Sequence, residues 1–276
     1  MERATPPTPG LPAAGGRARL FKIFYDEASR ASIQAPFEPL DNRDGRADWF
    51  ELWPMMTWLE RNPLEDGVWY GFFSPKFPQK AGVSLDDVAR VLAGAPEADV
   101  ALFTYDWLIP VQSLNAWTQG ERWQPGLIAA TEAFLASREQ PVDLRAVSAD
   151  LDDTVLSNFF VAKKRVWEDW LALARAYFDY VERGGPDLLD LRLVEHNSRH
   201  DYPLKVFVQE RLICWLLHTR GYAVARPDYL AEPKFGSRAL RLKAEWILQA
   251  KARRRRSGAR GSGPLQRLLS RLPPRA

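Results

Sequence analysis

Residues 154–182 read TVLSNFFVAKKRVWEDWLALARAYFDYVE, and the predicted fold depends on this stretch. Apolar residues recur in it at steps of three and four, as in an amphipathic helix. These are Val166, Trp167, Trp170, Leu171, Ala174, Tyr177, Phe178 and Val181. Burial stabilises by roughly 25 cal/mol per Å² of apolar surface, so this helix must pack on a sheet or another helix. Asn158 lies in the short apolar run before it, and we expect a substrate pocket where that strand turns into the helix.

The composition is typical of a globular protein, apart from its tryptophans. The chain has 276 residues, of which 46% are hydrophobic and 26% charged, and eleven are Trp. Most of these Trp residues are expected in the core, although Trp also often lines clefts. The single cysteine, Cys214, excludes an internal disulfide and agrees with a reducing compartment. The sequence shows neither a membrane-spanning apolar segment nor a signal peptide, so we expect a cytoplasmic protein.

The charge is concentrated at the C-terminal end. The net charge is +3, but residues 251–276 hold nine basic residues and no acid, which leaves −6 for the rest. The acidic body argues against an extended nucleic-acid-binding face. Leucines between 265 and 272 make the tail amphipathic, so it could hold the protein peripherally on an anionic inner-membrane surface. A nucleic-acid-binding tail and a merely solubilising tail are the alternatives.

Short strands alternate with helices along the chain. The predicted strands are 20–25, 67–73, 99–103, 144–148 and 222–225, and the predicted helices outside the opening stretch are 48–61, 84–92, 125–137, 203–218 and 237–256. Asp48 is a predicted N-cap, and Ser84 opens a predicted capping box. This rhythm predicts an α/β fold with a mostly parallel central sheet and helices on both faces.

The predicted organisation has four parts. Residues 1–18 are expected to be disordered, 19–236 to form one α/β domain, 237–256 a basic helix and 257–276 a basic flexible tail. Ligands bind such sheets at the carboxyl ends of the strands. The loops expected there are 26–46, 74–80, 104–122 and the turn near Asn158.

Strong catalytic motifs are missing from the sequence. It has no glycine-rich phosphate loop, no Gly-x-Ser-x-Gly elbow and no pair of cysteines. His196 and His200 are spaced as metal ligands on a helix would be, but the surrounding residues predict a loop. The carboxylates from Asp150 to Asp153 could hold a divalent cation and a diphosphate, or lie in a solvated loop.

Four charged residues are candidates for chemistry. Lys76 follows a predicted strand and could bind a phosphate. Asp106 follows another predicted strand. Glu210 and Arg211 lie within an apolar helix, so they either pair as a structural bridge or face a cleft.

Three segments together resemble a family. They are Trp-Tyr-Gly-Phe-Phe-Ser-Pro-Lys-Phe at 69–77, Asn-Phe-Phe-Val-Ala-Lys-Lys at 158–164 and Phe-Val-Gln-Glu-Arg at 207–211. In order and spacing they resemble bacterial cell-surface polysaccharide glycosyltransferases of GT-A-like fold, over roughly residues 20–230. The sequence departs from that group in having Ser-Pro-Lys where His-Tyr-Arg-Arg is common, and in lacking a clear Asp-x-Asp in the usual place.

The resemblance implies transfer of a sugar from a nucleotide-sugar to a glycan or lipid-linked acceptor. Lys76 and Arg211 would stabilise the leaving diphosphate, because no metal motif is evident, although a divalent cation remains open. Asn158 and Tyr70 would bind and orient substrate, and Asp106 or Glu210 would be the base. We expect Tyr70, Asn158 and Glu210 around one cavity. The alternative is a non-catalytic glycan- or nucleotide-binding protein of the same fold.

Overall fold

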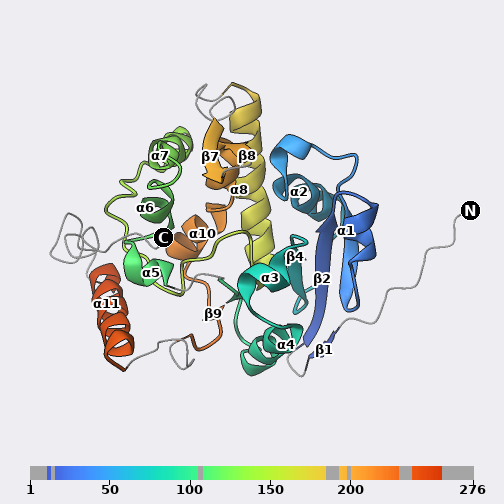
Figure 1. The fold of residues 1–276 in the computed structure, drawn as a ribbon, viewed down its shortest axis with the longest axis horizontal. Helices are drawn as coiled ribbons and strands as arrows, with labels where there is room; N and C mark the ends of the chain where they lie inside the picture. Colours follow the sequence, from blue (N-terminus) through green and yellow to red (C-terminus); the bar gives the residue numbers. More distant parts are fainter. Residues whose placement is uncertain are drawn as a thin grey trace, which may run out of the picture. The chain divides into compact units, whose positions relative to one another are not determined.

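The structure is a computed structural model that describes residues 11–13, 16–104, 108–184, 193–197, 200–229 and 238–256. The chain divides into two compact units, which are described separately (Figure 1). Unit one comprises residues up to 105, 158–171 and 222–227. Unit two comprises 106–157, 172–221 and 228–276.

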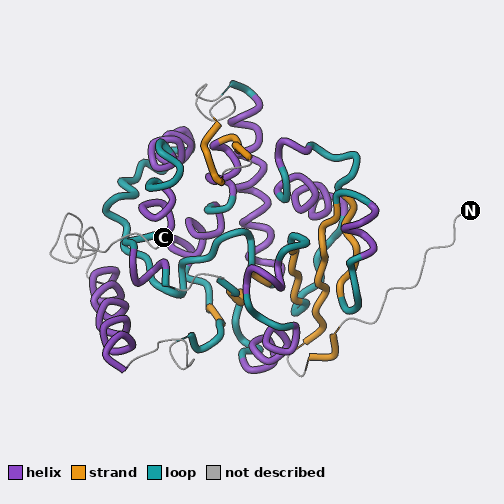
Figure 2. Tube along the Cα trace, in the orientation of Figure 1, coloured by secondary structure: helices purple, strands orange, loops and turns teal. Residues whose placement is uncertain are grey.

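Unit one is built on a mixed sheet (Figure 2). Its strands are β1 Leu11–Ala13, β2 Gly16–Phe24, β3 Phe37–Asp41, β4 Trp69–Phe73, β5 Val100–Leu102, β6 Phe160–Ala162 and β9 Val224–Ala225. The order is β1-β2-β4-β6-β5-β9, and β3 pairs with β2. Five of these strands run in one direction, while β1 and β6 run in the other. The fold class is therefore α/β with a mixed, mostly parallel sheet, in which β6 lies antiparallel between β4 and β5.

Helices lie on both faces of β4 within unit one. They are α1 Glu27–Ala31, the 3-10 turn η1 Ala47–Trp49, α2 Leu52–Arg61, α3 Phe77–Ala81, α4 Leu85–Gly94 and the first turns of α8 Lys164–Glu182. Successive residues of a strand point to opposite faces. Phe72 contacts Trp58 of α2 and Trp167 of α8, with ring centroids 5.3 and 4.9 Å away. Its neighbour Phe73 stacks at 4.0 Å on Phe77 of α3.

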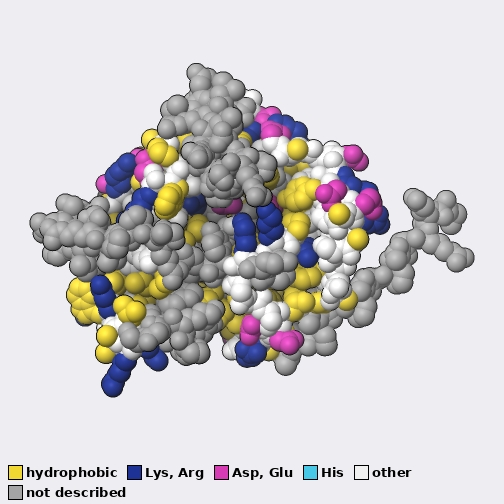
Figure 3. Space-filling model, in the orientation of Figure 1, with side chains coloured by type: hydrophobic (Ala, Val, Ile, Leu, Met, Phe, Trp, Pro, Cys, Tyr) yellow, Lys and Arg dark blue, Asp and Glu magenta, His cyan; other side chains and the backbone are white. Residues whose placement is uncertain are grey.

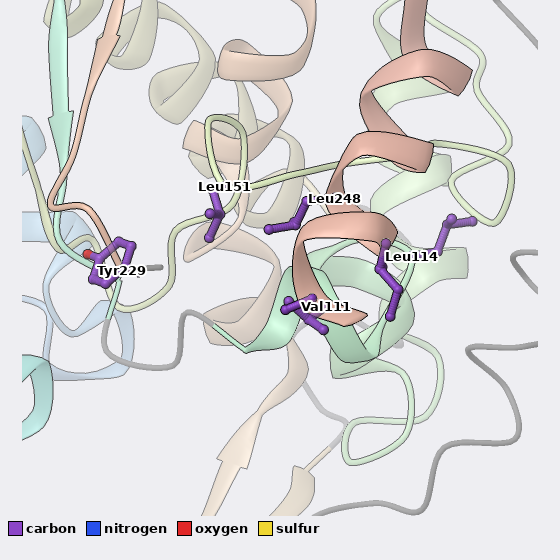
Figure 4. Close-up of a cluster of buried hydrophobic side chains, with 7 residues drawn as sticks. Val111, Leu114, Leu151, Tyr229 and Leu248 are labelled. Atoms are coloured by element: carbon purple, nitrogen blue, oxygen red, sulfur yellow. The ribbon is translucent and has the colours of Figure 1, made fainter. Parts of the chain in front are cut away.

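Unit two is mainly helical in its described part. It holds α5 Ile109–Gln112, α6 Ala116–Gly120, α7 Leu127–Ser137, the later turns of α8, the hairpin β7 Leu193–Asn197 and β8 His200–Pro203, α9 Leu204–Gln209, α10 Leu212–Arg220 and α11 Arg238–Arg256. A buried cluster joins α11 to α5 and the loop at Leu151, and Leu151 and Leu248 point toward each other in Figure 4. None of the described helices is long and apolar enough to cross a membrane.

The predicted strand 144–148 is wrong. Residues 144–146 form a turn in the structure. The Asn115 side chain donates to the carbonyls of Leu144 and Val147, both at 2.7 Å. A buried amide therefore satisfies backbone groups that a strand would have satisfied with a neighbour.

Other predicted elements have different bounds in the structure. Asp48 is not an N-cap: it pairs with Arg46 beside η1, and α2 begins later, after Glu51. The predicted helix 203–218 is broken at Glu210 and Arg211 into two helices. The backbone amide of Arg211 donates to the Val208 carbonyl, and its guanidinium donates to the Phe207 carbonyl. Loop 26–46 contains α1 and β3, and loop 104–122 contains α5 and α6.

The chain ends are described only in part. Strands β1 and the start of β2 lie within residues 1–18, which were expected to be disordered. The rest of that segment before Gly16 lies outside the described residues, and so does the predicted tail 257–276. The predicted helix 237–256 is confirmed as α11.

Candidate functional site at the carboxyl edge of the sheet

The register of the sheet brings several chain segments to one edge. The β2–β4 register pairs Lys22 with Phe73, and Tyr25 and Lys76 lie in the segments that leave these two strand ends. Since β6 is antiparallel, it begins where β4 and β5 end. Continuing those two registers places Asn158 between Ser74 and Thr104. The exits of β2, β4 and β5 and the entry to β6 therefore lie along the same edge of unit one.

The chain leaves β2 and β4 in opposite directions along the sheet, which is the arrangement found at ligand sites of α/β sheets. From β2 the chain leads to β3 on one side, and from β4 it leads toward β5 on the other. Neighbouring strands whose connections diverge leave a crevice outside their carboxyl ends, and ligands of α/β sheets bind there. Tyr25 and Lys76 are at the exits of these two strands.

A carboxyl group, a phenol and two ammonium groups interact at the edge. The Tyr25 phenol interacts with the carboxyl group of Glu51, the partly buried residue before α2. Burial raises the pKa of Glu51, whereas the charges of Lys80 and Lys76 and the bond from Tyr25 lower it. Burial and the Glu51 charge raise the pKa of Tyr25, so this phenol keeps its proton. Both lysines are exposed, so their ammonium groups are accessible to an anion.

Asn158 adds a buried amide at the same edge. It is 3% exposed, and its Oδ1 has no hydrogen-bond partner among the described residues. Its φ of 55° is left-handed, a conformation that Asn tolerates better than most residues. The following Phe159 contacts Phe77, the residue after Lys76, at 5.0 Å. The segments that carry Lys76 and Asn158 are therefore packed together. We call Tyr25, Glu51, Lys76, Lys80 and Asn158 the sheet-edge cluster.

The other predicted substrate residue of unit one lies elsewhere. Tyr70 is near the start of β4, at the end remote from Lys76, and is fully buried. Its hydroxyl accepts a hydrogen bond from the Glu65 amide at 3.0 Å, and its ring lies 6.0 Å from that of Trp58. These contacts make Tyr70 part of the core of unit one.

Glu210 and Arg211 belong to unit two. Arg211 is buried and donates to the carbonyls of Ala116 and Phe207 at 3.0 and 2.7 Å. Glu210 lies 3.9 Å from it. Within unit two, Arg211 thus joins the start of α6 to the end of α9. Asp106, the other predicted base, lies outside the described residues.

The carboxylates from Asp150 to Asp153 have basic partners in unit two. Asp153 lies 3.0 Å from His218 Nδ1 and 3.3 Å from Arg255 of α11, and Asp150 lies 4.0 Å from Arg255. Burial, with the nearby Asp153 and Asp152, raises the pKa of Asp150. No group of three acidic, His or Cys residues suited to a metal occurs in the described part of the chain. His196 and His200 lie on β7 and β8, not on a helix.

Sequence reasoning missed Tyr25, Glu51 and Lys80. Glu51 carried a usable signal, because it is a lone acid between Trp49–Phe50 and Leu52–Trp53. A carboxylate among such residues has to find partners. Its partners are Tyr25, directly after β2, and two lysines, one just before α3 and one in it. These residues are too far from Glu51 in the chain for local spacing to identify them.

The site is thus the carboxyl edge of an α/β sheet, with cations at a topological switch point. No family model, no curated protein and no solved structure matches the chain.

Proposed function

We propose that the sheet-edge cluster binds the diphosphate of a nucleotide-sugar, and that the protein is a glycosyltransferase of GT-A-like fold. The observation that carries the proposal is that two exposed ammonium groups, those of Lys76 and Lys80, follow β4 at the switch point between β2 and β4 and interact electrostatically with Glu51. Ammonium groups suit phosphate oxygens, and charge that develops on a leaving diphosphate needs such partners.

Each member of the cluster has a role in this proposal. Lys76 and Lys80 contact the diphosphate, and the Asn158 amide hydrogen-bonds a sugar hydroxyl. Burial raises the pKa of Glu51, and this carboxyl group exchanges a proton with the reacting hydroxyl. Tyr25 orients the Glu51 carboxyl group. The acceptor is a surface glycan or a lipid-linked sugar. Arg211 has no role at this edge in the proposal, because its guanidinium is bonded within unit two.

Ligand binding tests the proposal directly. Purified full-length protein is titrated with UDP-, GDP- and CMP-sugars, and the shift in unfolding temperature and the release of nucleotide are measured. We expect one nucleotide to bind and Lys76→Ala to weaken it by roughly 10- to 100-fold, since a hydrogen bond to a charged group contributes about 1.5–3 kcal/mol. Arg90→Ala is the matched control, because Arg90 is an exposed cation on α4 of the same unit.

Two outcomes would contradict the proposal. One is a well-folded protein that no nucleotide or nucleotide-sugar stabilises. The other is an Arg90→Ala variant that loses as much affinity as Lys76→Ala does.

Binding without catalysis is the second candidate, and the interaction between Tyr25 and Glu51 favours it. The Glu51 carboxyl group already interacts with the Tyr25 phenol, so an anion could bind to the lysines while this interaction is kept. Glu51→Gln separates the candidates: in an enzyme it abolishes nucleotide release and leaves binding intact. Nucleotide binding by the wild type with no release in the presence of acceptor glycans supports the non-catalytic function.

A further inference from the structure

Helix α11 has a buried face and an apolar exposed face. Ala244, Ile247, Leu248 and Lys251 are buried within unit two. Leu242 and Trp246 lie one turn apart, so they share a face, and they are 54% and 53% exposed. Figure 3 shows hydrophobic side chains gathered over α11 with Lys and Arg side chains beside them.

This concentration of exposed apolar surface is unusual for the described chain. Its large exposed hydrophobic residues are Trp123, Leu240, Leu242 and Trp246, and three of these four lie on α11. Leu240 lies on another side of the helix, so the exposed apolar face consists of Leu242 and Trp246. Single exposed apolar residues are ordinary, but neighbouring ones on one helix face indicate a surface that is covered by a partner.

The charge on α11 indicates what kind of partner this is. The helix carries eight basic residues and one acid, Glu245, which pairs with Arg241 at 2.9 Å. Two of the basic residues, Lys251 and Arg255, face the body of unit two, and the others leave an excess of positive charge on the helix. Lys243 and Arg253 are exposed. The covering surface therefore has to offer both negative charge and an apolar layer. A lipid bilayer with anionic headgroups offers both, whereas a nucleic acid would leave Leu242 and Trp246 in water.

Helix α11 is held so that this face stays outward. The Lys251 ammonium lies 2.5–3.0 Å from four backbone carbonyls, those of Pro110, Ser113, Leu114 and Ala149. Arg255 pairs with Asp153 at 3.3 Å. Rotation of the helix would break these contacts, so it cannot turn Trp246 inward.

We propose that the exposed face of α11 docks on an anionic membrane surface. The helix lies along the surface, with Leu242 and Trp246 at the boundary between headgroups and acyl chains. Exposed cations, Lys243 and Arg253 among them, contact lipid phosphates. This docking is independent of the nucleotide site proposed above, and it involves a described helix rather than the segment 257–276.

Vesicle sedimentation of the full-length chain tests the proposal. We expect at least tenfold stronger binding to vesicles of phosphatidylcholine with phosphatidylglycerol than to phosphatidylcholine alone. The double variant Leu242→Ser/Trp246→Ser should lose about tenfold in binding to the anionic vesicles, and Lys243→Gln/Arg253→Gln should lose a similar amount. Trp123→Ser is the matched control, because Trp123 is as exposed as Trp246 but lies outside α11, and it should bind as the wild type does.

Circular dichroism and unfolding temperature confirm that each variant folds. All variants keep residues 257–276, so a difference between them reports on α11. Unchanged vesicle binding by the apolar double variant overturns the proposal, as does an equal loss in Trp123→Ser. A wild type that binds a DNA duplex but no anionic vesicle at the same ionic strength also overturns it, in favour of a nucleic-acid partner.

Discussion

At the scale of single residues, Lys251 is an ionisable group enclosed by backbone carbonyls. It is fully buried, and four carbonyl oxygens surround an ammonium group that has three protons. Burial lowers the pKa of Lys251 to about 7, although the charges of Asp153 and Asp150 raise it. The carbonyl contacts favour the charged form and burial favours the neutral form, so this residue changes charge near neutral pH.

Lys251 should make stability depend on pH above neutrality. Between pH 7 and its ordinary pKa of 10.5, the unfolded chain keeps a proton that the folded chain has released. The free energy of unfolding should therefore rise with pH through this window. Urea unfolding at pH 7 and 9.5 measures the rise, and Lys251→Met should abolish most of it. An equal rise in Lys251→Met and the wild type would refute the assignment, whatever the variant does to absolute stability.

At the scale of elements, the end of α6 shows how one buried side chain restricts another segment. Gly120 is the last residue of α6, and a Cβ there would lie 2.4 Å from Arg211 Nη2 and 2.4 Å from Leu127 Cδ2. Arg211 cannot move aside freely, because its guanidinium is bonded to the carbonyls of Ala116 and Phe207. The glycine is therefore required by packing, not by its backbone conformation.

Two glycine substitutions test this constraint. Gly120→Ala should lower the free energy of unfolding by about 1–3 kcal/mol through overpacking. Gly94→Ala is the matched control, because Gly94 is also the last residue of a helix, α4, and a Cβ there meets no atom within 4 Å. The control should be neutral or stabilising by up to about 1 kcal/mol. Urea unfolding measures the free energy of unfolding of both variants. Equal values for Gly120→Ala and Gly94→Ala would contradict the close contact at Gly120.

At the scale of the whole molecule, the chain path makes unit one depend on distant segments. Unit one is assembled from residues up to 105, 158–171 and 222–227. Within the described sheet, β5 pairs with β6 and β9, and both of these come from the later segments. Residues 1–105 therefore contain β5 but neither of the strands, β6 and β9, that pair with it.

A fragment of residues 1–105 should not fold on its own. It leaves β5 unpaired and exposes the face of Phe72 that Trp167 covers in the intact chain. We expect circular dichroism to show no cooperative urea transition for this fragment, whereas the full-length chain should show one. A cooperative transition of the fragment would mean that β6 and β9 are dispensable for this sheet.

Much of the described local structure follows from sequence pattern. The three- and four-residue spacing from Val166 predicted α8, the Ser84 capping box is present at α4, and Gly221 ends α10 in a left-handed conformation. These features depend on residues within one or two turns of each other, so neighbouring residues are sufficient to specify them. Lys76 and Asn158 were also recognised from neighbouring residues, because each adjoins a predicted strand.

The sequence by itself therefore determined the α/β class, most of the helices, and two members of the sheet-edge cluster. Only the tertiary structure decided the order of the strands, the antiparallel direction of β6, and the meeting of Tyr25, Glu51 and Lys80. It also decided that the acidic loop at Asp150 pairs with α11. The physical reason is that register and charge pairing join residues far apart in the chain. Such contacts leave no periodic trace in the sequence.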